Sequence, residues 1–358
     1  MSTPTRDTRL WARLREVGQA TGDAPAQADT PWYLALLSGI AAWVAAWFLF
    51  VFVVDGAHWY RYRTGAMFGL GAVSASIALL AMHRARGRVF IEHLAVALSL
   101  GGQLLMGLGL DQLRTHVWMP GSPQTSWLWV AVAAIALAMH ALSRLPLHRF
   151  LCGGIFAASV LGACTADVPA LRVVAAPVLA WLALAAWWRS EAHDRVAPVL
   201  SPLAWALGLT ALLAAGFVDL DGWHFERLGA WSVWLRPLGD ALMVPLLPVC
   251  ALWLLRRQAG VAPRTRTALI ALSLVLALAC WRAPGVTLGA TLALAGFALH
   301  RPVLLVVGLC GIGGYLLRYY FQLDTTLLEK SGWLLAAGLV LLLARIAAHR
   351  LLAAGASR

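Results

Sequence analysis

The sequence contains few charged residues and few of the patterns that support catalysis. Only 12% of its 358 residues are charged, whereas 61% are hydrophobic. A soluble domain of this length does not bury that much apolar surface, so the composition predicts an integral membrane protein. The sequence contains no GxSxG and no HExxH motif. We therefore predict no catalytic residues, and an enzyme is the less favoured class.

Cysteine is also scarce. The five cysteines all lie inside apolar runs and none is part of a CxxC pair, which argues against a disulfide framework and against a thiolate metal site. We expect them to face the protein core or lipid, and we expect no cofactor. The net charge of +12 is spread over many short loops, so it does not indicate nucleic-acid binding. The cysteines are Cys152, Cys164, Cys250, Cys280 and Cys310.

Apolar runs predict an all-α, polytopic transmembrane bundle of about twelve spans. A polar, amphipathic tail (1–31) precedes the transmembrane domain (32–345), and a second tail follows it (346–358). The runs 266–281 and 285–299 are short and are joined by only three residues, so they form either two short spans or a re-entrant hairpin, and the total is twelve or ten. The predicted spans are 32–54, 64–82, 89–111, 127–142, 147–164, 170–188, 198–218, 237–255, 266–281, 285–299, 302–321 and 326–344.

Prolines predict one break within a span. Pro245 and Pro248 both fall inside 237–255. Each proline removes a backbone N–H donor and clashes with the preceding turn, so we expect this span to kink and to free backbone carbonyls.

Acidic residues recur at regular intervals along the chain. Asp55, Asp111 and Asp167 are 56 residues apart, and each follows an outward-going span. The pattern is compatible with stacked two-helix units related by duplication. The alternative is that hairpins of similar length each end in an outer turn that suits a small acid.

The third span, 89–111, carries polar residues within a run of membrane-crossing length. Glu92, Ser99 and Gln103 fall near one helical face. Polar side chains are expensive in hydrocarbon, so we expect this face to turn inward as a polar seam. Gln103 suits either a hydrogen bond to a neighbouring helix or a relay with Glu92. We assign Glu92, Ser99, Gln103, Asp111, Arg318, Asp324 and Lys330 as candidate binding residues.

One predicted outer loop, DLDGWHFER, contains weak candidate metal ligands. Its oxygen and nitrogen donors match no compact metal motif, and solvated loop charges are the favoured interpretation. We therefore predict no metal site. The donors are Asp219, Asp221, His224 and Glu226.

Several segments resemble one family of bacterial membrane proteins. FIEHLAVALSLGGQLL in the third span, the last span with its TLLxKS pattern, and PWYLALLSGIAAWVAAWFLF at 31–50 are similar to domain of unknown function 4401. Glu92-His93 stands where the family is expected to have Glu-Gln. The resemblance implies a multi-pass protein of the bacterial inner membrane and no agreed activity. It also implies a partner, a second membrane protein with a GDYxxLxY motif.

Three functions remain open from the sequence. The leading interpretation is a transporter or permease-like bundle, because an inward seam, broken spans and possible repeats are its ingredients. Short loops without a reaction motif favour a non-catalytic scaffold for the GDYxxLxY protein. An intramembrane enzyme that acts on a lipid-linked substrate is the third. A water-filled cavity at Gln103 would favour transport, and a closed bundle with an apolar lateral face would favour the scaffold.

The distribution of basic residues predicts that both termini are cytoplasmic. Nineteen of the 28 Lys and Arg residues lie on the side of the N-terminus, and nine lie on the other side. Reporter fusions after Arg358 and within 219–236 should give cytoplasmic and external signals, respectively. An external signal from the C-terminal fusion would overturn this topology.

Lys330, the only lysine, is predicted near the outer end of the last span. A cation in the first turns of a helix opposes the helix dipole, and lipid penalises it unless it snorkels or pairs. We expect Lys330 to pair with Asp324 or Asp111, closing the outer end of the seam or receiving an anionic group. Lys330→Glu should then reduce folded yield, and Asp111→Lys should partly restore it. Unchanged yield and thermal stability of Lys330→Met would show that Lys330 only snorkels.

Overall fold

The computed structural model describes residues 11, 14–18, 32–56, 65–85, 88–113, 126–167, 171–218, 232–258, 262–281 and 283–322, with single positions between 328 and 346. Every regular element in these ranges is helical, as the sequence predicts. Six described helices are long and apolar enough to cross a membrane. The helices are α2 (Trp32–Gly56), α3 (Ala66–Arg84), α4 (Val89–Leu113), α5 (Ser126–Leu142), α6 (Pro146–Asp167), α7 (Arg172–Ala192), α8 (Ala197–Val218), α9 (Ser232–Met243), α10 (Leu246–Arg257), α11 (Pro263–Ala279), α12 (Pro284–Ala298) and α13 (Pro302–Gln322).

Proline sets several of these boundaries. Pro146, Pro263, Pro284 and Pro302 are each the first residue of a helix. The N–H groups of the first turn have no helical partners, so a proline, which lacks an N–H, loses no hydrogen bond there. Its fixed φ also suits the helix. These prolines stop one helix from running into the next and keep the connections short.

The predicted proline break separates α9 from α10. The helix is interrupted at Val244 and Pro245, inside the span where the sequence predicts a kink. Near the interruption, the carbonyl oxygen of Leu242 accepts a hydrogen bond from the indole Nε1 of Trp181 on α7, at 2.9 Å. A carbonyl close to the break thus binds a neighbouring helix.

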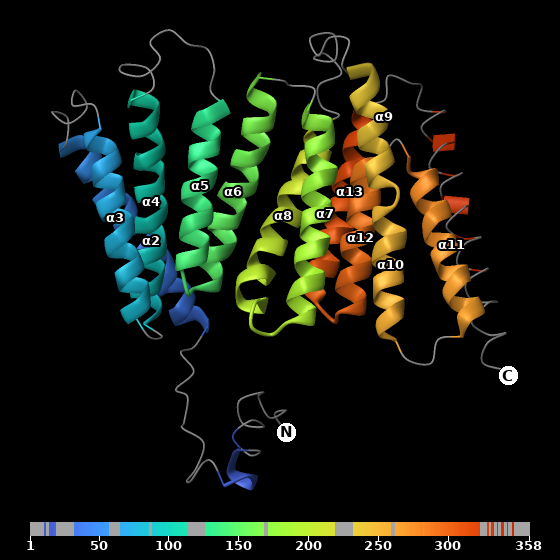
Figure 1. Ribbon diagram of the computed structural model, residues 1–358, viewed down its shortest axis with the longest axis horizontal. Helices are drawn as coiled ribbons and strands as arrows, with labels where there is room; N and C mark the ends of the chain where they lie inside the picture. Colours follow the sequence, from blue (N-terminus) through green and yellow to red (C-terminus); the bar gives the residue numbers. More distant parts are fainter. Residues whose placement is uncertain are drawn as a thin grey trace.

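Helix hairpins are the main packing units (Figure 1). The pairs α3–α4, α5–α6, α7–α8 and α12–α13 make the most extensive contacts. Glycines bring two of these pairs unusually close. A Cβ atom on Gly71 would lie 2.5 Å from the carbonyl oxygen of Gly102, and one on Gly102 would lie 2.7 Å from that of Gly71. Gly289 and Gly308 meet in the same reciprocal way in α12–α13. Small residues let backbones pack closely where lipid supplies little hydrophobic driving force.

Three of the regularly spaced acids occupy equivalent places in the fold. Asp55, Asp111 and Asp167 lie within the last three residues of α2, α4 and α6, respectively. The hairpin arrangement agrees with the predicted two-helix units, and their origin by duplication stays a prediction.

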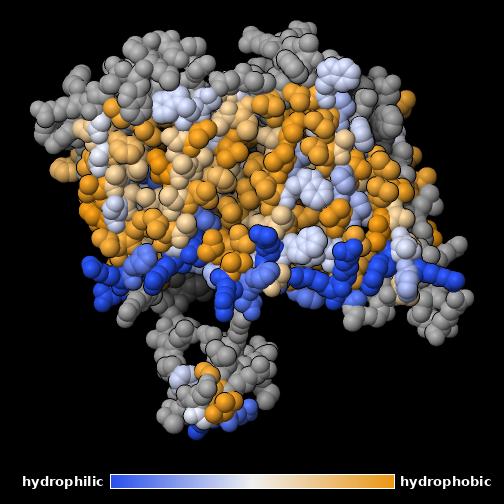
Figure 2. Space-filling model, viewed as in Figure 1, coloured by the Kyte–Doolittle hydropathy of each residue, from blue (hydrophilic) through white to orange (hydrophobic). Residues whose placement is uncertain are grey.

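The main hydrophobic core lies between α6, α7, α8, α10 and α12. It includes Leu179, Leu207, Leu246 and Leu288, each at most 3% exposed. Outside this core the molecular surface is a broad apolar band, and hydrophilic side chains line one edge of it (Figure 2). Both features suit helices surrounded by lipid.

Candidate functional site

The predicted polar face of α4 turns into the protein at its middle. Ser99 is fully buried and Gln103 is 6% exposed. Glu92 is half-buried, in the first turn of α4. The opposite face of the helix is less exposed than its sequence suggests, because Ala97 is buried too. Both α3 and α2 pack on α4, so α4 is covered on more than one side.

Two side chains of α6 meet Ser99 and Gln103 in a polar ladder. His148 Nε2 lies 2.9 Å from Ser99 Oγ, and Gln103 Nε2 donates a hydrogen bond to Cys152 Sγ at 3.4 Å. Both pairs are separated by 49 residues in the sequence. Ser99 and Gln103 are four residues apart on α4, and His148 and Cys152 are four residues apart on α6. Because four residues make about one helical turn, two helices that run side by side can form both contacts at once.

The ladder residues also contact one another along α6. Cys152 Sγ lies 3.5 Å from His148 Nε2 and 3.7 Å from His148 Nδ1. His148 and Cys152 are both fully buried. A cysteine nucleophile must be reachable by its substrate, so this Cys–His pair does not form an active site in the arrangement seen here. The ladder instead satisfies polar groups that would be costly to leave unpaired.

The short turn between α5 and α6 binds α8 through backbone carbonyls. Pro202, inside α8, has no N–H, so the carbonyl of Pro198 four residues earlier has no helical partner. The guanidinium of Arg149 donates a hydrogen bond to that carbonyl at 2.7 Å and, through Nε, a second to the carbonyl of Ser143 at 2.8 Å. Ser143 directly follows the last residue of α5, where carbonyls also lack helical partners.

His140 reinforces the same connection. Its Nδ1 lies 2.8 Å from the carbonyl oxygen of Arg149, and its Nε2 lies 3.0 Å from that of Val199 on α8. The imidazole is 1% exposed and links α5 to both α6 and α8.

The other side of the turn contacts α3 and α4. Ser143 Oγ accepts a hydrogen bond from the backbone N–H of Leu145 and lies 3.7 Å from Met82 Sδ on α3. We call the set Ser99, Gln103, His140, Ser143, His148, Arg149 and Cys152 the polar junction. It connects α3–α4 on one side and α8 on the other to the hairpin α5–α6.

A charge bridge joins three further elements. Glu191 of α7 accepts hydrogen bonds from Arg301 at 2.7 Å and from Arg257 of α10 at 3.4 Å. The guanidinium of Arg257 also lies 4.9 Å from the ring centroid of Trp253. These side chains are about a quarter to a third exposed, so the bridge orders the helix ends without adding much stability.

The remaining predicted residues lie near helix ends or outside the described part of the chain. Asp111 is half-buried near the end of α4, and Arg318 is half-buried near the end of α13. Asp324 and Lys330 lie outside the described residues, as do Asp219, Asp221, His224 and Glu226. Within the described part of the chain, no three His, Cys, Asp or Glu side chains are arranged to hold a metal ion.

Two grooves flank one exposed strip of α8. A groove of about 460 Å³ lies between α6 and α8, and another of about 550 Å³ lies between α8 and α13. Leu209 and Leu213 line both grooves. Small residues form much of the remaining lining, namely Gly154, Ala158, Ala206 and Ala214 in the first and Gly285, Cys310, Gly311 and Gly314 in the second.

We expect Ser99→Ala to destabilise the protein, because it leaves His148 without its 2.9 Å partner. Side-chain hydrogen bonds in membrane proteins contribute about 0.6 kcal/mol on average and up to about 1.7 kcal/mol. Thermal unfolding of the purified protein should show a lower Tm. The matched control is Ser76→Ala on α3, because Ser76 is exposed and bonds only the Ala72 carbonyl of its own helix. Equal shifts in the two variants would show that the ladder contact contributes nothing specific.

Comparison with known proteins identifies the family and no activity. No curated protein and no solved structure matches the chain. One family does match, over residues 31–351, which is nearly the whole chain and includes every helix described above. The chain belongs to the family described as domain of unknown function DUF4401.

Proposed function

We propose that this protein is a non-catalytic partner subunit of the bacterial inner membrane, with both termini in the cytoplasm. The arginines of the α3–α4, α5–α6, α7–α8, α10–α11 and α12–α13 connections all belong to the side predicted to be cytoplasmic. Figure 2 shows hydrophilic side chains gathered along the edge of the apolar band where these connections lie, and arginines there are typical of a cytoplasmic side.

The observation that carries the proposal is the pair of small-residue grooves beside α8. Leu213 is 52% exposed between them, and Gly314 is exposed on α13. A Cβ atom on Gly314 would meet no atom within 4 Å, so its backbone is open to an approaching helix. Transmembrane helices associate through small residues and close backbone packing. The grooves therefore suit a transmembrane helix of another protein, for which Leu209 and Leu213 form a central ridge.

The partner that we propose is the membrane protein with the GDYxxLxY motif. The family resemblance implies this partner, and the mainly apolar lining of both grooves is compatible with one of its transmembrane helices. Arg318 also lines the second groove, so the partner helix would need a polar group at that level. In this assignment the polar junction has a supporting role, because it fixes α6 relative to α8 and so fixes the shape of the first groove.

A permease is the second candidate, and the polar ladder is the observation that favours it. Polar side chains inside a membrane frequently mark transport paths. Conduction would require the bonds Ser99–His148 and Gln103–Cys152 to open, because all four side chains are at most 6% exposed. The partner-subunit assignment requires no such opening and is preferred for that reason.

Two adjacent glycines supply a matched test of the proposed interface. Gly313 and Gly314 are both exposed, and neither has an atom within 4 Å of a built Cβ, but only Gly314 lines the groove. Gly314→Leu should weaken co-purification with the co-expressed GDYxxLxY protein, since overpacking costs about 1–3 kcal/mol. Gly313→Leu should leave the complex intact, and both variants should keep the wild-type Tm when purified alone. Equal recovery of the partner by both variants would contradict the α8–α13 interface.

A further inference from the structure

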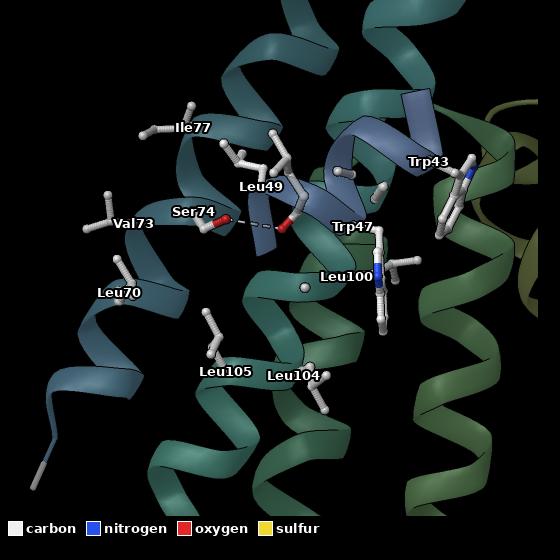
Figure 3. A pocket seen from close by; sticks show the side chains of 14 residues that line it. Trp43, Trp47, Leu49, Leu70, Val73, Ser74, Ile77, Leu100, Leu104 and Leu105 are labelled. Atoms are coloured by element: carbon white, nitrogen blue, oxygen red, sulfur yellow. Dashed lines mark hydrogen bonds between the residues drawn. The ribbon is translucent and has the colours of Figure 1, made fainter. Parts of the chain in front are cut away.

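A third groove lies far from α8, among the first three long helices. It encloses about 450 Å³ between α2, α3 and α4 (Figure 3). Trp43 and Trp47 come from α2, Val73 and Ile77 from α3, and several leucines from α4. The groove is separate from the interface proposed above, because no residue lines both.

The lining of this groove is suited to a hydrocarbon chain. Ser74 is its only side chain with a hydroxyl, and Ser74 Oγ already donates a hydrogen bond to the Leu98 carbonyl at 3.2 Å. Apart from the indole N–H groups of Trp43 and Trp47, the side chains that an occupant meets are apolar or, like Ser74, already hydrogen-bonded. The rim residues Val73, Ile77 and Leu104 are 56%, 57% and 55% exposed, so the groove opens sideways from helices that are long enough to cross the membrane.

An exposed stripe on α3 connects the groove to a cation. Leu70, Val73, Ile77, Leu80 and Arg84 follow one another at intervals of three and four residues, so they share one helical face. The first three line the groove, Leu80 is 57% exposed, and Arg84 is exposed at the last residue of α3. Arg88, also exposed, directly precedes α4.

The lengths along the helices agree with one leaflet of a bilayer. At 1.5 Å per residue, Ile77 lies about 10 Å from Arg84 along α3, and Leu70 lies about 21 Å from it. Half of a hydrocarbon core is about 15 Å thick, and the headgroup lies outside it. An acyl chain that starts near Arg84 would therefore run along Leu80 and enter the groove between Ile77 and Val73.

We propose that the α2–α4 groove binds an anionic phospholipid, with one acyl chain between Trp47 and Val73 and its phosphate at Arg84 and Arg88. The charge of the headgroup follows from the two exposed arginines at the end of the stripe. Glu92 is the one acid in the first turn of α4 and offsets only one of these two charges, so this end of the hairpin keeps a net positive charge.

The test is native mass spectrometry of the purified full-length protein with phosphatidylglycerol or phosphatidylcholine. Wild type should retain one phosphatidylglycerol in preference to phosphatidylcholine. Arg84→Gln should weaken phosphatidylglycerol binding about fivefold, the usual contribution of one basic residue to an anionic lipid surface. Arg256→Gln, which removes an exposed arginine at the end of α10, is the control and should leave the affinity unchanged.

Bulky substitutions in the groove test the position of the acyl chain separately from that of the headgroup. Val73→Trp should displace the lipid, whereas Val130→Trp on α5 should not, and the two valines are equally exposed at 56% and 58%. Ile77→Trp is the second groove-filling variant, in case Val73→Trp reduces yield. Unchanged binding in either groove-filling variant would show that the lipid sits elsewhere. Equal affinity for the two lipids, or equal losses in Arg84→Gln and Arg256→Gln, would overturn the headgroup assignment.

Discussion

The position of α6 relative to α8 depends on hydrogen bonds to backbone carbonyls near the start of α8. A proline in the first turns of α8 leaves the Pro198 carbonyl without a helical partner, and Arg149 in the first turn of α6 supplies the missing donor. His140 reaches the next carbonyl of the same helix. The imidazole of His140 is 1% exposed, and leaving it unpaired would cost about 1–3 kcal/mol. The Arg149–Pro198 contact is exposed and contributes less. The turn is therefore held against α8 by one buried contact, from His140, and one exposed contact, from Arg149.

The contacts within hairpins differ in kind from the contacts between hairpins. Within hairpins, reciprocal glycine pairs such as Gly71–Gly102 bring antiparallel helices together by shape. Between hairpins, the polar junction and the charge bridge of Glu191 set the position of one unit against the next. Glycine packing is insensitive to charge, whereas hydrogen bonds demand a fixed register. The second kind consequently determines the surfaces that α6, α8 and α13 present to a partner.

Much of the fold follows from the sequence, and the site follows only in part. Apolar runs and prolines locate the helices closely, because both act locally along the chain. The polar face of α4 is equally local, so the inward position of Ser99 and Gln103 can be predicted. Their partners cannot, because α4 and α6 are separated by the whole of α5. One signal was available: His148 and Cys152 repeat the four-residue spacing of Ser99 and Gln103, although a cysteine in an apolar run also suits an ordinary core position. The roles of His140 and Arg149 depend on carbonyls of α8, which no side-chain pattern reveals.

The central claim is that the polar junction closes the interior of the bundle, and labelling of Cys152 in native membranes tests it most directly. Cys164 is the matched control, since it lies on the same helix and is exposed. In a variant with Cys250, Cys280 and Cys310 replaced by alanine, a small membrane-permeant maleimide should modify Cys164. Cys152 should stay unmodified until Ser99→Ala or denaturant opens the ladder. Modification of Cys152 at the rate of Cys164 in the otherwise unaltered bundle would contradict a closed interior and would favour a permease.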